Sequence, residues 1–109
     1  MEIEKKDGIT IITTDERLDA VVAPKLKDTV KKIAEETATK LIIDLEKTKF
    51  IDSSGCGALV ASLRTLIKNQ GDMKIARPSP QAQTLFQLTR LHRVFEIYED
   101  MDQAIKSFS

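Results

Sequence analysis

Apolar residues along the chain change their spacing from one segment to the next. Short segments typical of strands occupy residues 2–5, 9–14, 40–45, 73–76 and 94–98; the first alternates charged residues with Ile3, and the others contain short apolar or β-branched runs. Elsewhere the apolar residues recur at intervals of three and four, which is the spacing of one helix face. The segments with this spacing are residues 24–37, 56–67, 80–88 and 101–108. The pattern predicts strands and helices in alternation along the chain.

Turn and capping residues mark the ends of several of these elements. Asp7-Gly8 predicts a hairpin turn between the first two strands, because glycine tolerates a positive φ. Gly71 is expected to end the second helix. Ser79 is expected to cap the third helix, with Pro80 in its first turn, where the missing N–H is harmless. Residues 17–20 are expected to form a plain connection.

The predicted order of elements is β-β-α-β-α-β-α-β-α, in one domain over residues 1–109. Alternating strands and helices are typical of an α/β fold with a mostly parallel sheet and right-handed crossovers. The first two strands form a hairpin and are therefore antiparallel, so the sheet is mixed. The run at residues 40–45 is short, mostly apolar and contains two β-branched residues, which predicts a central strand buried on both faces.

Composition and charge exclude several classes of function. The 17 basic and 17 acidic residues cancel, so the chain has no overall field to attract nucleic acid or an anionic membrane. A single cysteine, Cys56, excludes an internal disulfide and a cysteine-rich zinc site. The first residues lack the apolar core of a signal peptide, and no apolar run approaches the roughly 20 residues that cross a bilayer. We therefore expect a soluble, cytoplasmic protein with no nucleic-acid or membrane partner.

The stretch FIDSSGCGALV, residues 50–60, combines polar and small residues at a predicted helix start. Asp52, Ser53 and Ser54 are all preferred N-cap residues, although one cap suffices. Gly55 and Gly57 each cost up to about 1 kcal/mol relative to alanine in a helix, which suggests that something approaches the backbone closely. A helix N-terminus favours a phosphate or another anion, and a serine hydroxyl there can become a phosphoester.

This part of the chain resembles a known family. LIIDLEKTKFIDSSGCGALV is similar to the signature of the STAS domain, specifically of the bacterial anti-sigma factor antagonists, which carry Asp-Ser-Ser-Gly-x-Gly at a helix start. ERLDA before the first helix and SPQAQTLFQLTRLHRVFEIYED near the end match the family as well. The resemblance therefore covers essentially the whole chain, although the family often has glycine where this chain has Arg90.

The resemblance implies a partner switch controlled by phosphorylation. The second serine of the motif is the family's regulatory site, and it corresponds to Ser54. Asp52, Ser53, Gly55 and Gly57 would shape the surface that the partner recognises. The unmodified protein would bind an anti-sigma factor that is also a serine kinase, and so free a sigma factor, until phosphorylation ends the binding and a serine phosphatase restores it. The protein would be a ligand and a substrate, not an enzyme, with no cofactor or metal, and a monomer when free.

Other interpretations rest on weaker features. A serine hydrolase is disfavoured because SSGCG is not the G-x-S-x-G motif and the only histidine, His92, lies in a predicted turn. Cys56 begins an apolar stripe and is expected in the core, not as a reactive thiol. GCGALV satisfies neither phosphate-binding motif, so nucleotide binding is a minor alternative. A STAS scaffold or transport-complex subunit that does not switch is the alternative from another functional class.

Overall fold

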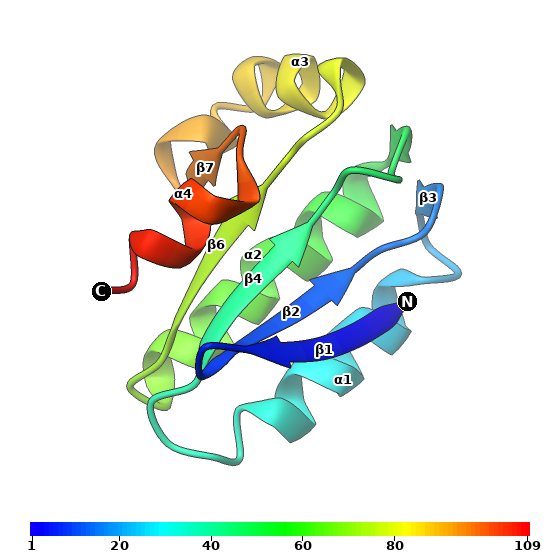
Figure 1. The fold of residues 1–109 in the computed structure, drawn as a ribbon. Helices are drawn as coiled ribbons and strands as arrows, with labels where there is room; N and C mark the ends of the chain where they lie inside the picture. Colours follow the sequence, from blue (N-terminus) through cyan, green and yellow to red (C-terminus); the bar gives the residue numbers. More distant parts are fainter.

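A five-stranded sheet runs through the computed structural model, which describes residues 1–109 (Figure 1). Its strands, in spatial order, are β1 (Glu2–Lys6), β2 (Ile9–Thr13), β4 (Lys40–Asp44), β6 (Asp72–Ala76) and β7 (Glu96–Tyr98). β1 pairs antiparallel with β2, and all the other pairs are parallel. The prediction of a mixed, mostly parallel sheet in an α/β fold is confirmed.

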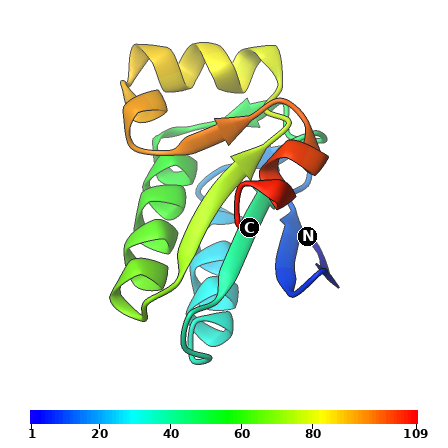
Figure 2. The ribbon, with the colours of Figure 1, turned by 60° about the vertical axis from the view of Figure 1, so that its left-hand side comes forward.

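Four α-helices surround this sheet, as the sequence predicts. Helices α1 (Ala23–Ile33) and α2 (Ser53–Lys68) pack side by side on one face of the sheet. Helix α4 (Met101–Lys106) lies on the opposite face, and helix α3 (Pro80–Leu88) crosses one end of the molecule, beyond the start of α2 (Figure 2). None of these helices combines the length and the apolar character that a membrane crossing requires.

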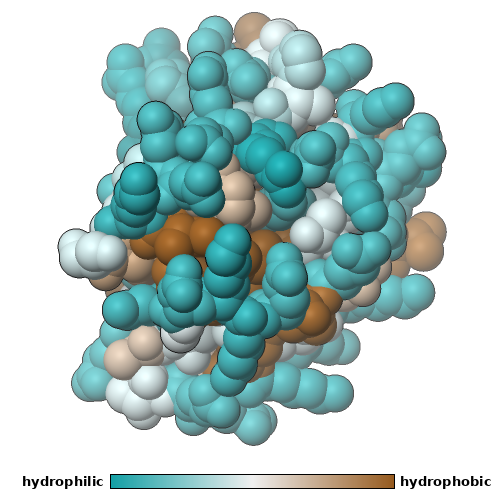
Figure 3. All heavy atoms as spheres, in the orientation of Figure 1, coloured by the Kyte–Doolittle hydropathy of each residue, from teal (hydrophilic) through white to brown (hydrophobic).

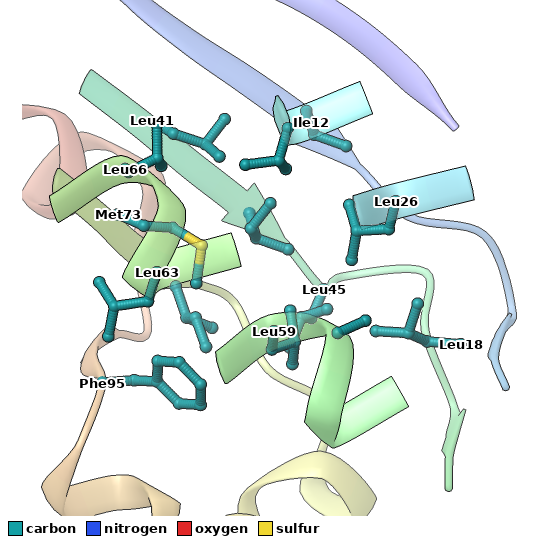
Figure 4. Close-up of a cluster of buried hydrophobic side chains, with 14 of the residues drawn as sticks. Ile12, Leu18, Leu26, Leu41, Leu45, Leu59, Leu63, Leu66, Met73 and Phe95 are labelled. Atoms are coloured by element: carbon teal, nitrogen blue, oxygen red, sulfur yellow. The ribbon is translucent and has the colours of Figure 1, made fainter. Parts of the chain in front are cut away.

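The main hydrophobic core fills the space between the sheet and helices α1 and α2 (Figure 4). The central strand β4 contributes Leu41, Ile42 and Ile43, all fully buried, which confirms its predicted burial on both faces. Each fully buried aliphatic side chain stabilises the fold by about 1.5–3 kcal/mol relative to its exposed state. Because the central strand and α2 share this core, the start of α2 is held at a fixed place at the end of the sheet.

Two apolar residues of the predicted helix stripes lie outside the core. Ile67 is 56% exposed, because α2 turns Leu59, Leu63 and Leu66 toward the sheet and Ile67 lies beyond that face. Leu88 at the end of α3 is 78% exposed, whereas Phe86 is fully buried. The sequence identified the helices correctly but assigned both of these residues to the wrong side.

The predicted hairpin turn and the predicted cap of α3 are confirmed, whereas the predicted end of α2 is different. Asp7 and Gly8 have φ values of 54° and 78°, the left-handed pair that matches the twist of a two-residue hairpin. Ser79 caps α3 by accepting a hydrogen bond from the Ala82 N–H at 3.2 Å. Gly71 does not supply the left-handed residue after α2; Gln70 does, with φ 67°. A side chain at Gly71 would collide with the Thr39 carbonyl oxygen, 2.4 Å from the position of its Cβ.

Several elements differ in extent from the prediction. The expected connection contains a short strand, β3 (Arg17–Leu18), which pairs in parallel with β5 (Phe50–Ile51) in a second, two-stranded sheet. Helix α1 ends at Ile33 instead of residue 37, because the Thr39 hydroxyl donates to the Ile33 and Glu36 carbonyls and terminates the helix.

The segment before the last strand also differs. A 3₁₀ helix, η1 (Leu91–Arg93), lies directly before the predicted strand at residues 94–98, and Val94 is its C-cap, so that Val94 is half-exposed and β7 begins only at Glu96. Arg90 precedes this helix with φ 61°, a left-handed conformation. The family that the sequence resembles often has glycine at this position, so the chain has a glycine-like backbone here with an arginine side chain.

A buried cation anchors α4 to the sheet. Lys74 on β6 is buried, and its Nζ donates to the Ser107 carbonyl oxygen at 3.1 Å and lies 4.5 Å from the centre of the Phe108 ring. A second cluster of buried apolar residues lies between α4 and the sheet: Ile9, Ile11, Ile42, Ala76 and Ala104. Figure 3 shows this face of the molecule, with hydrophobic atoms visible between hydrophilic side chains.

An ion pair joins the ends of β4 and β6. The buried Asp44 carboxylate accepts from Arg77 Nε at 3.2 Å and from Arg77 Nη2 at 2.6 Å, and these hydrogen bonds raise the pKa of the guanidinium. Arg77 also contacts the exposed Glu46 carboxylate at 2.9 Å. Its φ of 53° is unfavourable for arginine, so the ion pair holds the backbone in a strained conformation just before α3 begins.

We expect Asp44→Ala to lower the free energy of unfolding by about 2–4 kcal/mol, because it removes the main partner of a half-buried guanidinium. Glu46→Ala is the matched control, since it removes only the exposed carboxylate and is expected to cost less than about 1 kcal/mol. Urea unfolding followed by circular dichroism measures both variants. Equal losses of stability in the two variants would contradict the conclusion that Asp44 is the main partner of the Arg77 guanidinium.

Candidate functional site

Helix α2 begins with a single side-chain cap. Asp52 has extended backbone angles, and its carboxylate accepts a hydrogen bond from the Gly55 N–H at 2.9 Å. The Asp52 carbonyl oxygen accepts the first helical hydrogen bond, from Cys56 N–H at 3.0 Å. Of the three N-cap candidates in the sequence, Asp52 is therefore the one that caps the helix.

The two serines of the motif are left free by this arrangement. Ser53 and Ser54 are the first two residues of α2, and both are exposed. Neither hydroxyl caps the helix, because Asp52 does so, and both lie at the end where the helix dipole is positive. The geometry presents two accessible hydroxyls in a place that stabilises a negative charge.

The two glycines of the motif have different surroundings. A Cβ on Gly55 would lie 2.1 Å from the Leu18 carbonyl oxygen and 2.9 Å from Ile51 Cγ2, so the first turn of α2 packs directly on β3. A Cβ on Gly57 would meet no atom within 4 Å. Close approach to the backbone therefore explains Gly55, whereas Gly57 leaves a bare, exposed spot on the helix. Their predicted contact with a partner remains a prediction.

An open apolar groove of about 320 Å³ lies between α2 and α3. It is lined by residues of α2, of its capping segment, of α3 and of the turn that follows α3: Ile51, Asp52, Ser53, Cys56, Gly57, Val60, Leu85, Thr89 and Leu91. A second hollow of about 330 Å³ shares Ile51 and Leu85 and continues to the exposed Phe50 and Leu88. Ser53 thus borders a continuous apolar surface, and Ser54 follows it on the exposed start of α2.

Cys56 is a core residue, as its place in the apolar stripe predicts. It is buried in the first turns of α2. Burial, and secondarily the Asp52 carboxylate, raise the pKa of the Cys56 thiol. A raised pKa keeps the sulfur protonated, so the helix start does not produce a reactive thiolate here.

His92 has no part in the groove. It is exposed, and its Nδ1 lies 3.2 Å from the Phe86 carbonyl oxygen at the end of α3. His92 lines a separate hollow together with Gln83 and Glu99, and Ser53 is not part of that hollow. No nucleophile–base pair of the kind that a serine hydrolase uses is formed by these residues.

The sequence does not predict the apolar side chains that share the groove with Ser53. Leu85 belongs to a predicted helix, Leu91 to the segment after it, and Phe50 directly precedes the motif, so the sequence pattern gives none of them a place in a site. The Arg17 guanidinium lies 4.2 Å from the centre of the Phe50 ring, in a contact between β3 and β5. The available signal was the absence of charged residues from positions 78–89, which is unusual in a chain with 31% charged residues.

The two glycines provide a matched pair of variants. We expect Gly55→Ala to lower the free energy of unfolding by about 1–3 kcal/mol, because its methyl group would collide with the Leu18 carbonyl. Gly57→Ala is expected to leave stability unchanged or raise it by up to about 1 kcal/mol, since alanine is the better helix former. Urea unfolding of both proteins tests this, and a harmless Gly55→Ala would refute the close contact.

We expect Cys56 to react with iodoacetamide at least about tenfold more slowly in the folded protein than in urea, because it is buried and its thiol pKa is raised. Intact-mass spectrometry over time at constant pH measures both rates. Equal rates in the two states would show that the thiol is accessible and ionised.

Comparison with known proteins places this geometry in a family. The STAS domain family matches residues 1–104. The anti-sigma-B factor antagonist of Listeria monocytogenes is 30% identical over 99 residues, which cover 89% of this chain and 86% of that protein. A crystal structure of an anti-sigma factor antagonist from Mycobacterium paratuberculosis, 26% identical, superposes with a TM-score of 0.86 over 97% of this chain and 90% of that one.

SpoIIAA of Bacillus has the same fold at 22% identity. The unphosphorylated form of this anti-sigma factor antagonist gives a TM-score of 0.83, over 98% of this chain and 94% of that one. Its phosphorylated form gives 0.76, over 99% and 98%. The family match extends over almost the whole sequence, and the solved structures share the sheet, the helices and their order. The chain therefore belongs to the STAS domain family, among relatives that are anti-sigma factor antagonists.

Proposed function

We propose that this protein is an anti-sigma factor antagonist that phosphorylation of Ser54 switches off. In its unphosphorylated form it binds an anti-sigma factor, which is also a serine kinase, and the sigma factor held by that protein is released. Phosphorylation of Ser54 ends the binding, and a serine phosphatase restores it. The protein acts in the cytoplasm as ligand and substrate, is not itself an enzyme, and uses no cofactor.

The observation that carries this proposal is the exposed Ser54 in the first turn of α2. Its hydroxyl takes no part in capping, since Asp52 provides the cap, and it is open to a visiting kinase. The names of the relatives support an anti-sigma factor as the partner. SpoIIAA, with the same fold, is known in unphosphorylated and phosphorylated forms, which supports the switch.

Charge explains how one phosphate would end the binding. A phosphoserine carries about −1.5 to −2 charges at neutral pH. The N-terminus of α2 stabilises such an anion in the free protein by roughly 0.3–1 kcal/mol. A partner packed over Ser54 would have to bury the same charge next to the Asp52 carboxylate, which is costly unless a cation pairs with it. The modified protein is therefore stable alone and poor as a ligand.

The neighbouring residues have separate parts in this proposal. Asp52 fixes the helix start and adds negative charge beside the phosphate. Gly55 holds the first turn against β3, so that Ser54 has a defined position. Ser53 and Gly57 line the groove and form the floor on which the partner rests. We expect the free protein to be a monomer.

Substitution of Ser54 tests the switch. We expect Ser54→Ala to keep binding to the anti-sigma factor and to resist inactivation by ATP, because it lacks only the phosphate acceptor. Ser54→Asp and Ser54→Glu are expected to weaken binding by about tenfold or more, since each adds a charge to the interface. The measurement is the affinity of purified protein for the anti-sigma factor, isolated from the source cell with this protein as bait.

Ser53→Ala is the matched control, because it removes the neighbouring hydroxyl and leaves Ser54 in place. Mass mapping after incubation with the kinase and ATP should place one phosphate on Ser54 in the wild type and in this control. Acidic substitutions that bind as tightly as the wild type would contradict the charge mechanism. A partner that never phosphorylates the protein would favour a STAS subunit without a switch.

A further inference from the structure

The wall that α3 contributes to the groove carries no charge. Residues 78–89 contain no acidic or basic side chain, although 31% of the chain is charged. Leu85 lines both hollows, and Phe50 and Leu88 at their far end are 42% and 78% exposed. Depletion of charge around exposed apolar side chains is typical of the centre of a protein interface.

Three arginines without ion-pair partners follow groove-lining residues on α2 and on the turn after α3. The chain has five arginines; Arg17 and Arg77 form ion pairs, whereas Arg64, Arg90 and Arg93 form none. Arg64 follows Val60 by four residues and Gly57 by seven, so it extends the helix face that lines the groove. Arg90 lies between the groove residues Thr89 and Leu91, and Arg93 ends the same turn.

Three arginines follow residues of the groove, whereas a single carboxylate lines it. Asp52 is the only acidic residue that lines it, and its carboxylate accepts the Gly55 N–H. The nearby N-terminus of α2 adds partial positive charge. The surface is thus an apolar centre with a positive rim, in a chain whose total charge is zero.

We propose that this groove binds an acidic amphipathic segment of the partner protein, with apolar side chains on one face and Asp or Glu beside them. The apolar side chains fill the space between α2 and α3, and the carboxylates pair with Arg64 and Arg90. An amphipathic helix laid in a groove makes such contacts with residues spaced by three and four. The inference rests on the proposed function in one respect, namely that the segment belongs to the anti-sigma factor.

The acidic character of the segment also supplies the repulsion that the switch needs. Ser53 lines the groove and Ser54 follows it at the exposed helix start, so a phosphate on Ser54 lies at the edge of the bound segment. The phosphate repels those carboxylates of the segment that lie nearest to the start of α2. One modification thereby weakens the docking of the partner at the Ser54 end of the groove.

Two fluorescent peptides test the chemistry of the occupant. Both carry leucines at helical spacing on one face; one has glutamates beside them and the other has lysines at the same positions. We expect the full-length protein to bind the acidic peptide at least about tenfold more tightly than the basic one in fluorescence anisotropy. Absence of binding, or equal binding of the two peptides, overturns the inference.

Charge reversal locates the binding on the molecule. We expect Arg64→Glu combined with Arg90→Glu to lose the acidic peptide and to prefer the basic one. Lys31→Glu combined with Lys68→Glu is the matched control, because these lysines line a polar hollow elsewhere, between the ends of α1 and α2. A control that loses binding as strongly as the arginine variant would show only non-specific attraction and would overturn the proposal.

A third variant blocks the groove without disturbing the core. Gly57→Leu places a side chain in open space, so we expect full stability in urea unfolding and at least about tenfold weaker peptide binding. Unchanged binding by a folded Gly57→Leu overturns the inference. A dimer of the wild type in analytical ultracentrifugation that Gly57→Leu abolishes would assign the face to a second copy and would also overturn it.

Phosphorylation of Ser54 by the kinase partner is measured separately on the same proteins. If Ser54 is phosphorylated but the acidic peptide does not bind, the docking inference fails and the proposed switch stands. If the acidic peptide binds as expected but the kinase leaves Ser54 unmodified, the proposed switch fails and the groove chemistry stands.

Discussion

The contact between Gly55 and the Leu18 carbonyl oxygen holds the functional end of the molecule together. It seats the first turn of α2 on β3, and the paired strands β3 and β5 bring residues far apart in the sequence to the same place. Because the first turn of α2 packs on β3, the Asp52 carboxylate can cap that turn while Ser53 and Ser54 stay exposed. The exposure of Ser54 is therefore a product of packing, not of a loose loop.

Much of this structure was predictable because the deciding forces are local. The buried strand at residues 40–44, the left-handed turn at Asp7-Gly8 and the cap at Ser79 depend on neighbours in the sequence. β3 and β5 have two residues each and are too short to give a periodic signal in the sequence. They form only because they pair with each other in the folded chain. The exposed Ile67 and Leu88 show the same limit, since the side of a helix that faces the core is set by tertiary packing.

The motif was predictable from residue type, but its surroundings were not. An Asp followed by two serines and a glycine identifies a helix start, and the family resemblance points to one serine. The groove beside it is assembled from α2, α3 and the turn after α3, which have no common pattern in the sequence. The Arg77–Asp44 ion pair lies just before α3 and sets where that wall of the groove begins. Long-range pairs of this kind become visible only in the folded chain.

The contacts of Lys74 with Ser107 and Phe108 decide where a sensor surface or a dye can be attached to the protein. Its ammonium group donates a hydrogen bond to the Ser107 carbonyl and contacts the Phe108 ring. Both contacts lie on the side of the sheet away from α1 and α2. A tether joined after Ser109 would leave from that side, away from α2. Immobilisation through such a tether leaves the opposite surface accessible, whereas a label that displaces Phe108 would loosen the terminal helix.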